Sequence, residues 1–169
     1  MPQTPTSDCL PTTWTARADT DAGAVRYVQV ARGLRWVGRA LMLVDLAPCT
    51  ICMVPAAGRV GRLSTGAFLD EWAQTQAQAR AGRAERGVPA VLSLMDAAAQ
   101  LVGDAEVLLS EPTIYGDGLR YTADLRSGAL PGASGACVLF INVSFADVGH
   151  GPPDPRHPGS AGRGERGRS

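Results

Sequence analysis

The most constraining feature of the sequence is an apolar segment, Ala40–Leu46, that leads directly into a pair of closely spaced cysteines, Cys49 and Cys52. Six of its seven residues are apolar, and Asp45 is the exception. A short apolar run of this kind, followed by a proline, is typical of a buried strand. The segment 39–72 is therefore predicted to build the core, with two thiols at its junction.

Strands are predicted on both sides of this feature and again near the C-terminus. The density of Val, Ile, Tyr and Phe between turn residues supports each of them. The predicted strands cover 24–30, 34–37, 40–46, 50–54, 106–109, 113–115, 119–125 and 136–144. A turn is expected at Arg32-Gly33, and a hairpin turn is expected at 116–118. The apolar strand 136–144 is expected to lie beside 40–46.

Two helices are predicted in the middle of the chain. The first begins at Ser64 or Thr65, whose hydroxyl caps free N–H groups, and Phe68 and Trp72 follow at helical spacing. The second begins at Pro89 and ends before Gly103. Its expected buried stripe consists of Val91, Leu92, Met95, Leu101 and Val102.

This order of elements predicts a single α+β domain, with a mainly antiparallel sheet and two helices. The domain is expected over 23–148. Residues 1–22 contain three prolines and no periodic pattern, which predicts a flexible arm. Residues 149–169 contain no apolar residue larger than proline, which predicts a disordered Pro/Gly/Arg tail.

The charge pattern narrows the possible functions. Sixteen basic residues balance 16 acidic ones, and every basic residue is arginine. The balance predicts no general attraction to nucleic acid, and the lack of lysine excludes a phosphate-loop lysine. No apolar run is long enough to span a bilayer, and the N-terminus lacks the pattern of a signal peptide. We therefore expect a soluble, intracellular protein without a membrane partner.

The Cys49-x-x-Cys52 pair is the clearest candidate for chemistry. Its local sequence resembles the active-site entry of thioredoxins, and the segment that ends at Pro89 resembles the one that carries their cis-proline. This resemblance implies a thiol–disulfide oxidoreductase that uses Cys49, Cys52 and Pro89. However, the intervening segment 68–87 is polar and helical in pattern, where a thioredoxin needs a strand. The favoured interpretation is two buried structural cysteines, and the redox function is the alternative.

No metal or cofactor site is predicted. Zinc would need two further ligands besides the cysteine pair, and the candidates are Cys9, Cys137, His150 and His157. Both histidines lie in the predicted disordered tail, so no ordered scaffold is expected to present a histidine general base. No complete catalytic set is present, and the protein is predicted not to be an enzyme.

Several short segments carry a resemblance to a viral family. They are Leu43-Val44-Asp45, Cys52, Gly61-Arg62-Leu63-Ser64-Thr65, Trp72 and Thr113-Ile114-Tyr115-Gly116. In these segments the chain resembles the alphaherpesvirus nuclear protein family encoded by the fourth gene of the unique-long region. The resemblance implies a small, non-enzymatic accessory protein of the host nucleus that contacts other viral or host nuclear proteins. It carries over no catalytic residue, and it leaves partner identity and oligomeric state open.

Overall fold

The fold was obtained as a computed structural model that describes residues 25–79 and 87–142. The predicted arm and tail lie outside these ranges. The described residues form nine strands, one α-helix and one short 3-10 helix. In chain order these are β1 Arg26–Val37, β2 Ala40–Leu46, β3 Cys49–Val54, η2 Pro55–Ala57, β4 Arg59–Ser64, α1 Thr65–Ala79, β5 Val88–Met95, β6 Leu101–Tyr115, β7 Gly118–Gly128, β8 Ala133–Ser134 and β9 Cys137–Ile141.

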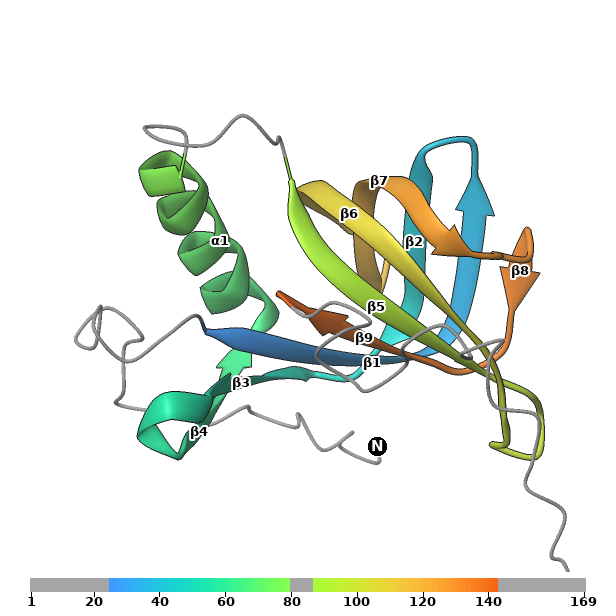
Figure 1. The fold of residues 1–169 in the computed structure, drawn as a ribbon, viewed down its shortest axis with the longest axis horizontal. Helices are drawn as coiled ribbons and strands as arrows, with labels where there is room; N and C mark the ends of the chain where they lie inside the picture. Colours follow the sequence, from blue (N-terminus) through green and yellow to red (C-terminus); the bar gives the residue numbers. More distant parts are fainter. Residues whose placement is uncertain (1–24, 80–86, 143–169) are drawn as a thin grey trace, which may run out of the picture.

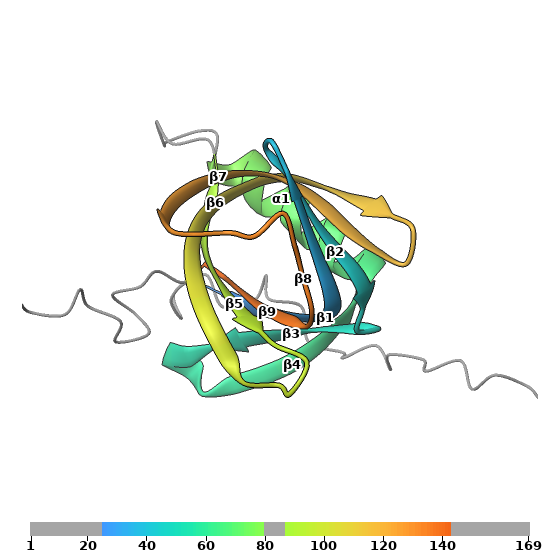
Figure 2. The same ribbon diagram turned by 90° about the vertical axis from the view of Figure 1, so that its right-hand side faces the viewer.

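The strands form one antiparallel sheet that closes into a barrel. The strand order is β2-β7-β6-β5-β9-β1-β3-β4, and an additional pairing between β2 and β1 closes six of these strands into a ring. Figure 2 shows this ring from one end, with α1 behind it. The sheet continues beyond the ring through β3 and β4, which form a hairpin.

The long strand β1 makes the closure possible because its two halves pair with different strands. Its first half pairs with β3 on one edge and β9 on the other. Its second half pairs with β2 and β8. The β3–β4 hairpin therefore leaves the barrel at the start of β1, on the same side as α1 (Figure 1).

The helix α1 confirms the first predicted helix and packs against one end of the barrel. The Ser64 hydroxyl accepts a hydrogen bond from the Ala67 N–H at 3.2 Å, as its expected capping role requires. The buried Phe68 ring packs against Tyr27, with 5.3 Å between ring centroids. Trp72 reaches across to Tyr121 of β7 at 5.9 Å. Aromatic packing thus joins the helix to β1 and to β7 of the ring.

The predicted α+β class is wrong, because the second predicted helix does not form. The residues that were expected to make its buried stripe lie in β5 and in the first part of β6, which pair with each other. Between them Asp96 makes a turn, since its Oδ1 accepts hydrogen bonds from the N–H groups of Ala98 and Gln100. The protein is a mostly antiparallel β barrel with a single α-helix among its described residues.

The expected neighbour of the last strand is also wrong. β9 lies between β1 and β5, whereas β2 lies between β1 and β7. The turn expected at Arg32-Gly33 is absent, because β1 runs through it without a break. The hairpin turn at 116–118 is confirmed: β6 ends at Tyr115 and β7 begins at Gly118.

The inside of the barrel is filled by side chains. Leucines from all six ring strands are fully buried there. These are Leu34, Leu41, Leu43, Leu92, Leu109, Leu119 and Leu139. The polar exceptions are hydrogen-bonded: Tyr121 donates to Gln29 Oε1 at 2.7 Å, and Gln29 Nε2 donates to Thr50 Oγ1 at 3.1 Å. The interior is therefore a packed core.

Candidate interaction surface

The outer surface of four neighbouring strands, β4, β3, β1 and β9, carries an apolar patch that we call the apolar face. Cross-strand pairing brings its members together: Ile51 is opposite Val28, which is opposite Phe140. Val30 is opposite Val138 in the next row, and Met53 is opposite Val60. The apolar face is defined by Val28, Val30, Ile51, Met53, Val60, Val138 and Phe140.

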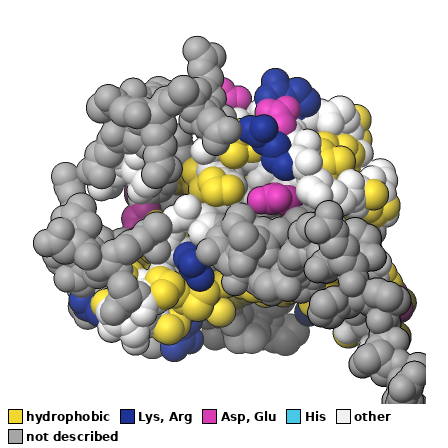
Figure 3. Space-filling view, viewed as in Figure 1, with side chains coloured by type: hydrophobic (Ala, Val, Ile, Leu, Met, Phe, Trp, Pro, Cys, Tyr) yellow, Lys and Arg dark blue, Asp and Glu magenta, His cyan; other side chains and the backbone are white. Residues whose placement is uncertain are grey.

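Three residues of the apolar face are notably open to solvent. Val60 keeps 71% of its surface exposed, Val30 keeps 44% and Ile51 keeps 38%. The other four members are half-buried. Figure 3 shows hydrophobic side chains gathered at the lower left, over β3 and β4. An exposed apolar patch of this kind commonly marks a site of contact with another protein.

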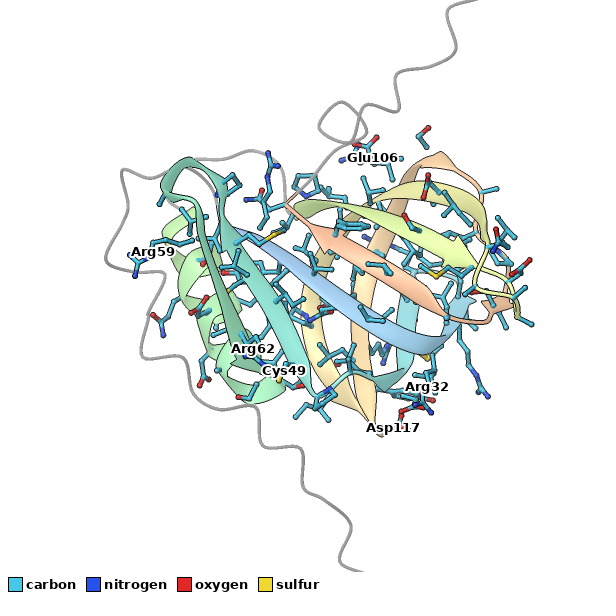
Figure 4. The ribbon with its side chains drawn as sticks, turned by 90° about the horizontal axis from the view of Figure 1, so that it is seen from below. Arg32, Cys49, Arg59, Arg62, Glu106 and Asp117 are labelled. Carbon is cyan, nitrogen blue, oxygen red and sulfur yellow. The ribbon has the colours of Figure 1, made fainter. Side chains whose placement is uncertain are left out.

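The charged residues on this face have a single sign. Arg26 is opposite Met53, and Arg62 is opposite Ile51, so both arginines share the outer surface with the apolar residues. None of the four strands contains Asp or Glu. Figure 4 looks onto this side of the molecule and labels Arg62 and Cys49 on it. The face therefore combines apolar contact area with two arginines, each of which also has an interaction within the chain.

The structure does not bring the sulfurs of Cys49 and Cys52 together. Both residues lie in β3, and side chains three positions apart in a strand point to opposite faces. Cys52 is free and buried on the inner side, whereas Cys49 lies on the outer side and is disulfide-bonded. Pro89 lies in β5, which is separated from β3 by β1 and β9.

The surroundings of Cys52 do not activate its thiol. Burial raises the pKa of the Cys52 thiol, and the nearby Glu71 carboxylate raises it further. A reactive cysteine needs the opposite, a lowered pKa and an electropositive environment. The same carboxylate accepts a hydrogen bond from the Tyr27 hydroxyl at 3.0 Å. Glu71 thus anchors α1 to the barrel and sits beside a structural thiol.

The candidate zinc ligands are not assembled among the described residues. Cys137 is free and buried on the inner side of β9, while Cys9, His150 and His157 lie outside the described ranges. Within 25–79 and 87–142, no group of three or more His, Cys, Asp or Glu side chains is placed to hold a metal ion. Over the same ranges, no helix has the length and apolarity needed to cross a membrane.

Comparisons with known proteins give no match. No protein-family model, no curated protein and no solved structure matches this chain. The resemblances to the alphaherpesvirus family and to thioredoxins therefore stay predictions.

The apolar face was not predicted from the sequence, although part of its pattern is visible there. Along 26–31, both the odd and the even positions carry apolar residues, since Tyr27 alternates with Val28 and Val30. A strand that is apolar on both sides has a second face to cover. If the predicted strand 50–54 had begun at Cys49, the alternation of side chains along a strand would have placed Cys49 and Cys52 on opposite faces of the sheet.

Proposed function

We propose that the protein is a non-enzymatic viral accessory protein that acts through contacts with other proteins in the host nucleus. The apolar face carries the interaction part of this proposal, because Val30, Ile51 and Val60 present apolar surface to solvent. The viral and nuclear part is supported by the resemblance of segments around Cys52 and Trp72 to the alphaherpesvirus family.

A contact function is favoured over small-molecule chemistry by the way the barrel is filled. Small-molecule sites are concave pockets with a few convergent polar groups. Here the inner positions of the barrel hold buried leucines, and the buried polar groups of Gln29, Thr50 and Tyr121 bond to one another. The surface that offers binding energy is instead the outer one.

A protein partner is favoured over nucleic acid by the composition of the apolar face. Nucleic-acid affinity comes chiefly from several basic side chains that contact phosphates. On this face two arginines accompany seven apolar residues. Protein interfaces are enriched in aromatic residues, Met and Arg, and this face offers Phe140, Met53 and two arginines.

The proposal is tested with tagged full-length protein expressed in infected cells. Ile51→Glu and Val60→Glu each place a carboxylate on the apolar face, and Val102→Glu is the matched control. Val102 is an exposed valine of β6, at 62%, outside the face. We expect nuclear proteins that co-purify with the wild type and with the control, and that fall at least about tenfold with both face variants. Each such protein is then purified, and its binding to the wild type is measured directly.

Two results would contradict the proposal. One is a set of co-purifying proteins that is the same for all four forms of the protein. The other is a wild-type protein that stays wholly in the cytoplasm of infected cells.

A further inference from the structure

The strand β4 offers an edge at the border of the apolar face. It is the last strand in the sheet order, and it pairs with β3 on one side only among the described strands. An edge strand presents a row of backbone N–H and C=O groups that another extended segment can pair with. The apolar face therefore lies next to a row of backbone N–H and C=O groups with which another strand can pair.

Two cross-strand rows of the outer surface end at this edge. One row runs from Val60 to Met53 and Arg26. The other runs from Arg62 to Ile51, Val28 and then Phe140 of β9. Val60 and Arg62 are two positions apart, so their side chains leave the strand on the same side. A strand added beside β4 would extend both rows by one residue each.

We propose that β4 binds an extended segment of a partner protein as a further antiparallel strand. This segment carries an apolar residue opposite Val60 and an acidic residue opposite Arg62, two positions apart. The inference rests on the proposed function, since the added strand would enlarge the apolar face. Backbone pairing supplies affinity in such complexes, and the alternating side chains supply specificity.

The acidic position follows from the charge of the edge. Opposite charges on directly paired strand residues stabilise the pairing, and like charges destabilise it. β4 contains Arg59 and Arg62 but no acidic residue. Arg59 and Arg62 each already make an interaction within the chain, and the five N–H donors of a guanidinium allow a second partner. A carboxylate on the added strand is the group that this position selects.

The same charges disfavour a second copy of the protein as the occupant. Pairing β4 with itself brings two further arginines and no carboxylate to the edge. Charged edge residues of this kind are a common protection against self-association through strands. The edge therefore discriminates between an acidic partner and another copy of itself.

The test uses the full chain and a phage-displayed library of random 12-residue peptides. Arg62→Glu reverses the charge at the edge, and Arg35→Glu is the control on an exposed arginine of β1 outside the face. We expect the wild type and the control to enrich peptides with an apolar and an acidic residue two positions apart. Arg62→Glu is expected to enrich peptides with a basic residue in the acidic position.

Hydrogen exchange then locates the bound peptide. One enriched peptide is synthesised, and the exchange of the β4 amides that point away from β3 is measured with and without it. We expect these amides to exchange fast in the free protein and at least about tenfold more slowly with the peptide bound.

Four results would overturn the inference. They are no enrichment, an enrichment that Arg62→Glu leaves unchanged, bound peptide without slower β4 exchange, and outward β4 amides that are already slow in the free chain. The last result would show that the edge is occupied by a segment of the same chain or by a second copy. If the co-purification of nuclear proteins still depends on Ile51 and Val60, only the strand-addition proposal is rejected, and the proposed function is retained.

Discussion

The two faces of β1 and β9 are both apolar, but they are used differently. On the inner face, Tyr27, Leu139 and Ile141 are buried against the rest of the barrel and α1. On the outer face, Val28, Val30 and Phe140 retain part of their surface to solvent. Hydrophobicity alone therefore does not identify the core of a barrel strand. Substitutions are expected to separate the two faces, because an inner change should lower folding stability and an outer change should weaken the proposed binding.

The largest loss of stability is expected for Phe68→Ala. Phe68 is fully buried, and its ring centroid lies 5.8 Å from that of Trp72 and 5.3 Å from that of Tyr27. Truncating a buried aromatic residue removes its transfer free energy and leaves a cavity, which together cost about 3–5 kcal/mol. Urea unfolding followed by circular dichroism measures this change, and the partly buried Leu69 provides Leu69→Ala as a milder comparison. A loss below about 1 kcal/mol would mean that α1 does not cap the barrel.

A smaller loss is expected for Tyr121→Phe, which keeps the ring and removes one buried hydroxyl. Gln29 Oε1 then loses the donor that lies 2.7 Å away, and it stays buried. An unsatisfied buried acceptor costs about 1–3 kcal/mol. The measurement is the same urea titration, combined with Gln29→Met in a double-mutant cycle. Additive effects of the two substitutions would contradict a direct bond between these side chains.

Stability is also expected to fall as the pH rises above about 9. Burial raises the pKa of the Cys137 thiol to about 11 from its ordinary value of 9.0. The folded state therefore holds this proton in a range where the unfolded state has lost it, so folding is favoured below pH 9 and this advantage disappears between pH 9 and 11. For Cys137 alone the loss is about 1 kcal/mol at pH 10.

The check is a comparison of Cys137→Ala with the wild type in urea titrations at pH 8 and pH 10. The variant should lose less stability between the two pH values. Burial also raises the pKa of Tyr121, so the variant should keep part of the dependence. Equal losses in both proteins would show that Cys137 ionises freely in the folded state.

The elements that could be predicted from the sequence are those that a few neighbouring residues specify. The cap at Ser64 and the spacing of Phe68 and Trp72 predicted α1, and the glycines around Asp117 predicted the hairpin turn. The segment that begins at Pro89 failed for a physical reason. Its apolar run fits either a buried strand or a helix, and only pairing with β6 and β9 decides between them.

The closure of the barrel could not be predicted from the residues of any one segment. It depends on contacts between residues far apart in the chain, such as Leu41 opposite Tyr121 and Val28 opposite Phe140. The residues of one segment do not determine with which distant strand it will pair. The apolar face could not be predicted for the same reason. Its cross-strand rows form only when β3, β1 and β9 pair with one another.

The smallest change in stability is expected on the outer face, for Val30→Thr and Ile51→Thr. Threonine keeps the branched shape that favours a strand and replaces one apolar group with a hydroxyl. Both positions lie on the exposed side of their strands, so the free energy of unfolding should stay within about 0.5 kcal/mol of the wild type. The inner substitution Ile141→Thr is the comparison and should cost at least about 2 kcal/mol, because it buries a hydroxyl in the core. Equal costs at inner and outer positions would show that the outer face is also part of the folding core, and it would then be unavailable to a partner.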